Sequence, residues 1–256
     1  MEEKVFIAAL AGLLHDIGKF ALRADESGSR NWDQDAVRDY KYKHALLTED
    51  FIQKFVPDPW KSSIKYLAAN HHRPTTDQER LILIADHLSS AERIDEAGVE
   101  VDERTKHPKQ LLRIFCSLKA DGQTVQPNKY FPLLPLNLTE KTLFEDSILY
   151  EQDTGKYYKD LWEGYTEAAK HLSQAHGDST DLQTYLESML LMLQRYTWCI
   201  PSAYYNSLPD VSLYDHGRMT AALAAILMRS NLPSQEIINL SQNPEQYPNP
   251  IACLVG

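Results

Sequence analysis

The chain has 256 residues, of which 43% are hydrophobic and 24% charged, a composition typical of a globular protein with one large domain. Its formal net charge of −10 argues against broad nonspecific binding to nucleic acid, but it is compatible with one locally positive cleft. The three cysteines are far apart and have no metal-ligand spacing, which argues against a disulfide framework and favours a reducing cytoplasm.

The first predicted element is a helix over residues 3–20. Its apolar run, VFIAALAGLL, is too short to span a bilayer, and it has the wrong flanks for a signal peptide, with glutamates before it and His15-Asp16 directly after it. We therefore expect a buried core helix that carries His15 and Asp16 at its end. Gly18 is expected to let the chain turn away there.

The middle of the chain contains a polar segment, then a helical region, then a Pro-rich region. A polar loop is expected over 24–35, and helices are expected after it over residues 36–56, 60–71 and 77–93. From about 105 to 150 the chain is Pro-rich and only weakly periodic, with a small hairpin expected around Ala120-Asp121-Gly122.

Helical periodicity returns in the last third of the chain, over 153–175, 180–196 and 211–229. The tail from residue 231 to 250 is expected to be a loop, and the closing IACLVG is expected to begin a buried strand. These elements predict a mainly α fold with a small β-containing insertion.

A set of histidines and aspartates lies at helix ends or on apolar helices. Each has an ordinary structural interpretation when taken alone, such as a capping pair, a solvated helix end or a satisfied core acid. Together they supply the imidazole nitrogens and carboxylate oxygens that suit Mn, Fe, Co, Ni or Zn, and an aspartate can bridge two such ions. The set is His15, Asp16, His44, His71, His72, Asp86 and His216.

Four motifs, HDIGK, KHALLTED, NHHRP and ADHLSS, resemble the HD superfamily of metal-dependent phosphohydrolases, whose nuclease members follow the order H…HD…H…HH…D. The first histidine of that order is missing upstream of His15 and reappears near the other end in DHGRMTAALAAIL. The resemblance implies a mainly α fold, a circularly permuted HD-domain helical bundle with a small β-containing, Pro-rich insertion and additional helices.

A permuted HD domain that opens with ALAGLLHDIGKF and closes with PSAYYNSLPDVSLYDHGRMTAALAA is similar to the N-terminal part of the large subunit of type III CRISPR effector complexes. The resemblance covers residues 5 to about 230. It implies four regions: HD core helices with most metal ligands (1–104), a Pro-rich and helical insertion (105–200), a closing permuted helix (201–232), and a linker with the first strand of a polymerase-like palm (233–256). We therefore expect a fragment or one half of a split gene product. The cyclase motif of that family, GGDD, does not occur in this sequence, so cyclic oligoadenylate synthesis is not carried over.

The activity implied by the resemblance is metal-dependent cleavage of single-stranded DNA in antiviral defence. It would take place in the cytoplasm, in a complex with partner subunits, CRISPR RNA and an activating target RNA. Residue by residue, one divalent ion would be held by His15, Asp16, Asp86 and His216, and a second by Asp16, His44, His71 and His72. Manganese is the expected ion, with Ni, Co, Fe or Zn as alternatives and one or two ions bound.

Basic side chains near these motifs are candidates for contact with DNA. Lys19 can meet the phosphate as a point charge, or it can be a solvated lysine favoured by the helix dipole. Other candidates for a basic groove are Arg23, Lys41, Lys43, Arg73 and Arg93. Tyr40, Tyr42 and Trp32 are possible stacking residues, although aromatic residues of this kind more often anchor the core or a loop.

Two other functions stay open on the sequence. An HD nucleotidase or cyclic-nucleotide phosphodiesterase would apply the same metal chemistry to a small substrate, but a nonpermuted order is more usual there. A catalytically silent HD domain could act as a scaffold for complex assembly, although the complete ligand set argues against decay of the site. Exonuclease and endonuclease action are equally open.

Overall fold

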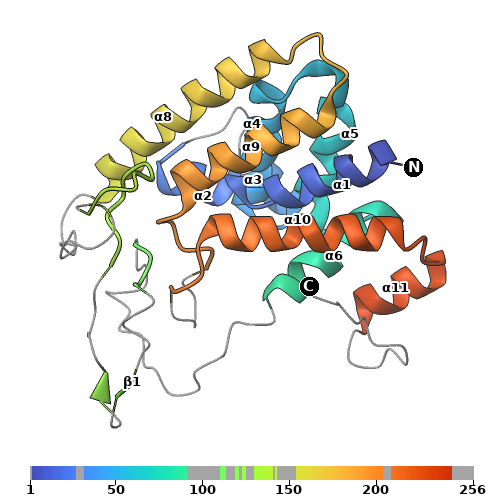
Figure 1. Cartoon of the computed structure of the whole chain (residues 1–256). Helices are drawn as coiled ribbons and strands as arrows, with labels where there is room; N and C mark the ends of the chain where they lie inside the picture. The colour runs from blue at the N-terminus through green and yellow to red at the C-terminus, as the bar shows by residue number, and fades with distance from the viewer. Residues whose placement is uncertain are drawn as a thin grey trace.

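The computed structural model describes residues 2–26, 32–90, 110–113, 119–120, 123–124, 130–140, 142, 154–203 and 209–243. Over these residues the chain is a mainly α helical bundle, as predicted (Figure 1). Its helices are α1 (Glu2–Leu14), α2 (Ile17–Arg23), α3 (Trp32–Asp35), α4 (Lys43–Phe55), α5 (Asp58–Ala69), α6 (Asp77–Ser90), α8 (Thr154–Ala175), α9 (Leu182–Thr197), α10 (Leu213–Arg229) and α11 (Ser234–Gln242), with a π-helical turn at Ala36–Tyr40 and a 3₁₀ turn at Asn70–His72.

The predicted hairpin is present as two short antiparallel strands, β1 (Lys119–Ala120) and β2 (Gln123–Thr124), with Lys119 opposite Thr124. The predicted closing strand and Arg93 lie outside the described residues.

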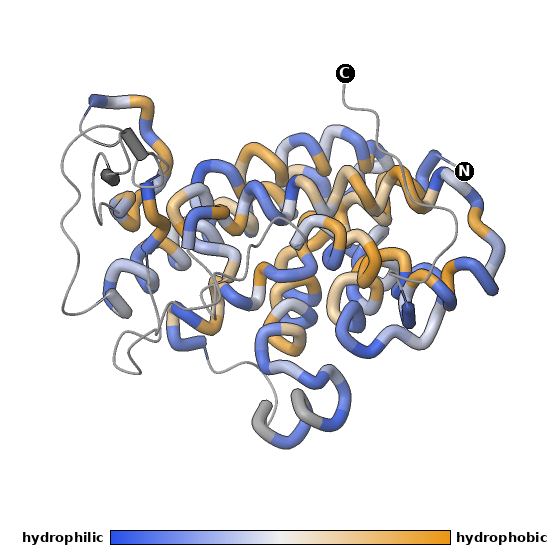
Figure 2. The backbone as a smooth tube through the Cα atoms, turned by 90° about the horizontal axis from the view of Figure 1, so that it is seen from below, coloured by the Kyte–Doolittle hydropathy of each residue, from blue (hydrophilic) through white to orange (hydrophobic). Residues whose placement is uncertain are grey.

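The core of the bundle lies around α1, whose residues from Ala8 to Leu14 are all buried. Figure 2 shows apolar residues in orange concentrated where the helices face one another. Among the described residues, Glu2–Arg23 is the helical stretch that is long and apolar enough to cross a membrane, and 72% of its most apolar window is buried inside the bundle. This burial agrees with the predicted core helix.

Helices α8 and α9 lie side by side and cover α1, α2 and α4 on one side (Figure 1). Aromatic rings form much of this contact. Phe20 of α2 meets Trp162 edge to face with ring centroids 4.9 Å apart, and Phe51 of α4 stacks on Tyr165 at 5.3 Å. Helices α8 and α9 therefore pack on the rest of the bundle largely through aromatic contacts.

Four predicted element boundaries were wrong. The loop predicted over 24–35 ends in a short helix, α3, at Trp32–Asp35. The first helix ends at Leu14, and Gly18 lies inside α2, so the turn is at His15-Asp16. The helix predicted over 36–56 is interrupted at Lys41, which has φ 74°. The tail predicted as a loop contains α11, because Ile237 and Leu240 are buried and α11 packs against α6.

The first helix, α1, and the late helix α10 pack against each other as the permutation requires (Figure 1). Glycines allow this close approach from both sides. A Cβ on Gly12 would lie 3.0 Å from the carbonyl oxygen of Thr220, and a Cβ on Gly217 would lie 3.0 Å from that of Leu13. Because neither glycine has a side chain, His15 at the end of α1 comes close to His216 in the first turn of α10.

The turn between α1 and α2 is held against α4. The buried hydroxyl of Thr48 donates to the carbonyl oxygen of His15 at 2.9 Å and accepts from the backbone N–H of Gly18 at 3.0 Å. A Cβ on Gly18 would lie 1.8 Å from the carbonyl oxygen of His44. Gly18 is therefore required for the contact between α2 and α4, and not for a turn.

The segment between α5 and α6 is fixed by the buried carboxylate of Glu79. It accepts from the Asn70 side-chain amide at 2.7 Å, from the Thr75 N–H at 2.6 Å and from the Thr76 N–H at 2.9 Å. These bonds hold the pKa of Glu79 below its usual value, although burial opposes its ionisation. The 3₁₀ turn that carries two of the predicted ligands is thus anchored at both ends.

We predict that Gly18→Ala destabilises the protein by about 3 kcal/mol, because the new methyl group overlaps backbone that cannot move without separating α2 from α4. Urea unfolding of both proteins measures this. Gly177→Ala is the control, since its Cβ would meet no atom closer than 3.6 Å. Equal stability of Gly18→Ala and the wild type would show that the two helices can separate at little cost.

We predict that Glu79→Gln lowers the free energy of unfolding by about 2 kcal/mol at neutral pH, since bonds to a charged acceptor are the stronger ones. The folded pKa of Glu79 lies below the ordinary value of about 4.5, so this stabilisation is complete above that pH and is lost as the pH falls through the folded pKa. Urea unfolding of wild type and variant should therefore converge on acidification. Glu163→Gln, on an exposed position of α8, should show no such pH-dependent difference.

Candidate metal centre

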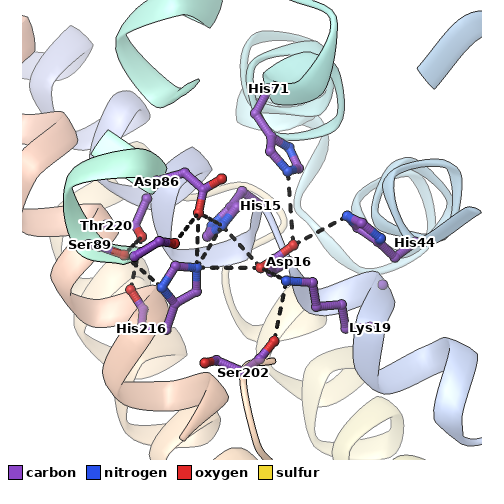
Figure 3. Close-up of polar contacts among 12 residues, drawn as sticks. His15, Asp16, Lys19, His44, His71, Asp86, Ser89, Ser202, His216 and Thr220 are labelled. Carbon is purple, nitrogen blue, oxygen red and sulfur yellow. Dashed lines mark hydrogen bonds and ion pairs between the residues drawn. The ribbon is translucent and has the colours of Figure 1, made fainter. Parts of the chain in front are cut away.

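All seven predicted ligand side chains come together around Asp16, at the break between α1 and α2 (Figure 3). His15 directly follows the last residue of α1, His44 lies in the first turn of α4, and Asp86 comes from α6. His71 and His72 come from the 3₁₀ turn, and His216 comes from α10. The site therefore joins both ends of the sequence.

The seven residues form two groups that share Asp16, and in each group the ligand atoms lie within 4.8 Å of one another. The first group, which we call the inner group, is His15, Asp16, Asp86 and His216. The second, which we call the outer group, is Asp16, His44, His71 and His72.

In the inner group two carboxylates face two imidazoles. Asp16 Oδ2 lies 3.3 Å from His15 Nε2 and 3.4 Å from His216 Nε2. Asp86 Oδ1 lies 3.5 Å and 3.1 Å from the same two nitrogens. All four residues are buried.

Burial opposes charge on His15, Asp16 and Asp86, but the opposite charges prevail. The carboxylates of Asp16 and Asp86 raise the pKa of His15 to about 10. Lys19 and His15 hold the pKa of Asp16 well below its usual value, and hydrogen bonds from His15 and His216 do the same for the pKa of Asp86. In the inner group the ionised carboxylates of Asp16 and Asp86 thus lie next to the His15 imidazolium.

The outer group has a different electrostatic character. Burial lowers the pKa of His44 to about 3 and that of His72 to about 4, and it lowers the pKa of His71 well below its usual value. These imidazoles are therefore neutral at physiological pH, with a lone pair available on one ring nitrogen.

Two buried atoms of the outer group fit a cation. Asp16 Oδ1 and His71 Nε2 have no hydrogen-bond partner among the described residues and face each other at 3.9 Å, and His44 Nε2 lies 3.4 Å from the same oxygen. Unpartnered buried polar atoms are costly in a native fold. A divalent ion between a carboxylate oxygen and neutral imidazole nitrogens would satisfy both, so the residues present fit such an ion.

Backbone carbonyls set the tautomer of two ligands. His15 Nδ1 lies 2.7 Å from the carbonyl oxygen of Gly12, and His71 Nδ1 lies 2.6 Å from that of Ala68. A carbonyl oxygen can only accept, so in both rings Nδ1 carries the proton and donates. The Nε2 atom of each ring is left to face the cluster, which is the arrangement that metal-ligating histidines show.

A chain of hydroxyls has the same effect on His216. Thr220 Oγ1 donates its single proton to the carbonyl oxygen of His216 at 2.9 Å, so Ser89 Oγ must donate to Thr220 Oγ1, also at 2.9 Å. Ser89 has then no proton left for His216 Nδ1, 2.6 Å away, and accepts the proton of that nitrogen. His216 Nε2 is therefore the ring nitrogen that faces the two carboxylates.

Sequence reasoning missed these hydroxyls. Ser89 follows Asp86 by three positions and Thr220 follows His216 by four, so each shares a helix face with a ligand. That spacing is the signal that could have found them.

Three of the basic side chains proposed for DNA contact, Lys19, Arg23 and Arg73, are engaged within the protein. Lys19 Nζ donates to Asp16 Oδ2 at 2.5 Å and to the carbonyl oxygen of Ser202 at 3.3 Å. Arg23 donates to the carbonyl oxygen of Pro201 at 2.6 Å, so both cations of α2 hold the segment that leads into α10. Arg73, which is exposed, donates to the carbonyl oxygen of Arg38 at 2.6 Å.

The family match and the similar proteins agree with one another. Residues 1–118 match the HD domain family. The chain is 29% identical over 237 residues to a CRISPR system single-strand-specific deoxyribonuclease Cas10/Csm1 (subtype III-A) of Methanocaldococcus jannaschii, covering 85% of this chain and 27% of that protein. It is 25% identical over 225 residues to the protein of the same name from Streptococcus thermophilus, covering 83% of this chain and 26% of that protein.

Two solved structures share the fold. Csm1 of T. onnurineus matches with a TM-score of 0.59 and 20% identity, over 90% of this chain and 29% of that chain. A chain of the Csm1–Csm4 cassette in complex with cA4 matches with a TM-score of 0.51 and 19% identity, over 90% of this chain and 28% of that one. The chain thus spans about a quarter of the length of the curated relatives it matches. It carries an HD domain of the kind found in the large subunit of type III CRISPR effector complexes.

Proposed function

We propose that this chain is the nuclease part of a type III CRISPR interference complex and hydrolyses phosphodiester bonds of single-stranded DNA. The observation that carries the proposal is the position of Asp16, whose Oδ2 faces the inner group while its unpartnered Oδ1 faces the outer group. A carboxylate that serves two sets of imidazoles is the arrangement that a two-metal phosphoesterase needs. The printed names of the relatives supply the substrate.

The inner group would hold one divalent ion and the outer group a second. Mixed nitrogen and oxygen donors suit manganese, and Ni, Co, Fe or Zn are the alternatives. The bound ions supply a coordinated water of lowered pKa and neutralise charge on the phosphate. Because His15 is protonated between two carboxylates, loading of the inner group requires loss of that proton from Nε2.

The protein supplies orientation and one positive charge. The bonds of His15 to Gly12, of His71 to Ala68 and of His216 to Ser89 fix three rings before any substrate arrives. Lys19 stands beside Asp16 with its side chain 22% exposed, so its ammonium would be the point charge that meets a nonbridging phosphate oxygen. His15, Asp16 and Lys19 are therefore the proposed catalytic residues.

The rest of the molecule would act around this centre. We propose the HD core at 1–104, the insertion at 105–200, the closing helix at 201–232, and a linker with the start of a palm at 233–256. The remainder of the large subunit, other subunits, CRISPR RNA and target RNA would be its partners in the cytoplasm. Since the chain carries a net charge of −10, its own affinity for DNA should be weak, with Arg23, Arg73 and Arg93 as proposed contacts that partner subunits would reinforce.

The test is hydrolysis by the purified chain with Mn²⁺, on single-stranded DNA, duplex DNA and a panel of nucleotides that includes cyclic ones. We expect cleavage of the single strand, its loss on chelation, and a decrease of more than about 100-fold in Asp16→Asn and in His15→Ala, since even the partners of metal ligands contribute 10- to 100-fold. Asp58→Asn and His171→Ala, both exposed, are the matched controls.

Each of the other outcomes would lead to a different conclusion about the function of the chain. Preferred hydrolysis of nucleotides would identify a nucleotidase or cyclic-nucleotide phosphodiesterase. Binding of Mn²⁺ without hydrolysis of any substrate would favour a scaffold. Unchanged cleavage in both site variants would show that the activity belongs to a contaminant.

We also predict that Ser89→Ala weakens binding of Mn²⁺ about 10- to 100-fold, because His216 Nδ1 loses its acceptor and the ring is free to rotate or change tautomer. Isothermal titration calorimetry on the metal-free chain measures this. Ser230→Ala, whose hydroxyl bonds the carbonyl oxygen of Leu227 at the other end of α10, should bind as the wild type does. Wild-type affinity in Ser89→Ala would show that His216 is positioned by packing alone.

A further inference from the structure

Tyr42 lies at the edge of the outer group and is 43% exposed. Its ring is stacked on the His44 imidazole, with centroids 5.6 Å apart and planes 12° from parallel, and it meets His72 edge to face at 4.6 Å. Among the described residues with exposed large apolar side chains, Tyr42 is the one in ring contact with proposed metal ligands. An aromatic surface thus continues from the metal centre to solvent.

The fold does not require an exposed ring at this position. Tyr40, two residues earlier, has an ordinary core role, since it is 4% exposed and its hydroxyl hydrogen-bonds the carboxylate of Glu49. Leaving 43% of this tyrosine exposed to water forgoes hydrophobic stabilisation that burial would give. Exposure next to a catalytic cluster therefore points to a ligand for the ring.

The backbone before Tyr42 is strained. Lys41 has φ 74° and ψ −40°, in the region that side chains other than glycine rarely adopt, and it follows the π-helical turn Ala36–Tyr40. Such strain costs about 1–3 kcal/mol and persists where the surroundings, usually at a functional site, hold it in place. Here the strained residue interrupts what the sequence predicts as a continuous helix and brings Tyr42 to the edge of the outer group.

Lys41 adds a positive charge over the ring, with Nζ 5.1 Å from the Tyr42 centroid. The combination of an aromatic face and an ammonium matches the two parts of a nucleotide, a base with a π face and a phosphate. It stands out because the chain as a whole is acidic.

We propose that Tyr42 is the stacking platform for one nucleobase of the strand whose phosphodiester reaches the metal centre, with Lys41 next to the adjoining phosphate. The proposal rests on the nuclease function proposed above and adds a reason for its strand selectivity. Stacking on an aromatic side chain requires a base that is free of its own stack, and a single strand offers this without the energy that a duplex must spend on unstacking. Because every base has a π face, the platform tolerates any sequence.

The test is a double-mutant cycle between the ring and the base. Wild type, Tyr42→Leu and Tyr42→Phe are assayed with Mn²⁺ on a single-stranded oligonucleotide and on a strand of equal length made of abasic residues, which has the phosphates and lacks the bases. We expect Tyr42→Leu to lower kcat/KM on the normal strand about 5- to 100-fold and to leave the abasic strand unchanged. Tyr42→Phe should retain wild-type behaviour, and Tyr66→Leu, with a ring 50% exposed on α5, should alter neither substrate.

Binding of labelled strands, followed by fluorescence anisotropy, gives the same comparison without turnover. An equal loss on both strands in Tyr42→Leu, accompanied by weaker Mn²⁺ affinity, would show that the ring only positions His44 and would overturn the platform. Equal binding and cleavage of the normal strand by wild type and Tyr42→Leu would overturn it as well. If the wild type hydrolyses neither strand yet binds the normal one through Tyr42, the platform stands and the proposed nuclease function falls.

Discussion

The structure depends on a buried carboxylate at a break between two helices. Asp16 occupies the N-cap position of α2, where an aspartate normally accepts a hydrogen bond from a helix N–H, but its side chain makes no such bond. Both carboxylate oxygens face imidazoles and Lys19 instead. A charge at this depth is stable only when it is paired, so the positions of α1, α2, α4 and α10 follow from the need to surround Asp16 with cations and donors.

The need to surround Asp16 also explains why α1 and α10, which are far apart in the sequence, pack together. His216 reaches Asp16 only because α1 and α10 cross with Gly12 on one side and Gly217 on the other. Lys19 and Arg23 then bond the carbonyl oxygens of Ser202 and Pro201 and hold the segment before α10 in place. The permuted order of motifs therefore corresponds to a local contact. Side chains of α2 bind the backbone of the segment that precedes α10, the helix that carries the last proposed ligand, His216.

Much of the site could be predicted from the sequence, because each ligand has a distinctive residue type in a motif of fixed order. Both the mainly α fold and the set of side chains that meet around Asp16 could be predicted from the sequence without any distances. The role of Gly18 could not be predicted, since its neighbour, the carbonyl oxygen of His44, is a tertiary contact. The break at Lys41 could not be predicted either, because hydrophobic periodicity carries no information about backbone strain that distant packing imposes.

The two ligand groups differ in a way that orients the proposed chemistry. The inner group is buried, has two carboxylates, and anchors both of its imidazoles through Nδ1. The outer group shares its single carboxylate with the inner one, and His44 and His72 are only partly buried. A charged phosphate loses less hydration at the open side, so the outer group is where a strand would enter. Tyr42 lies on that side, which makes one nucleotide at the outer group the natural unit of recognition.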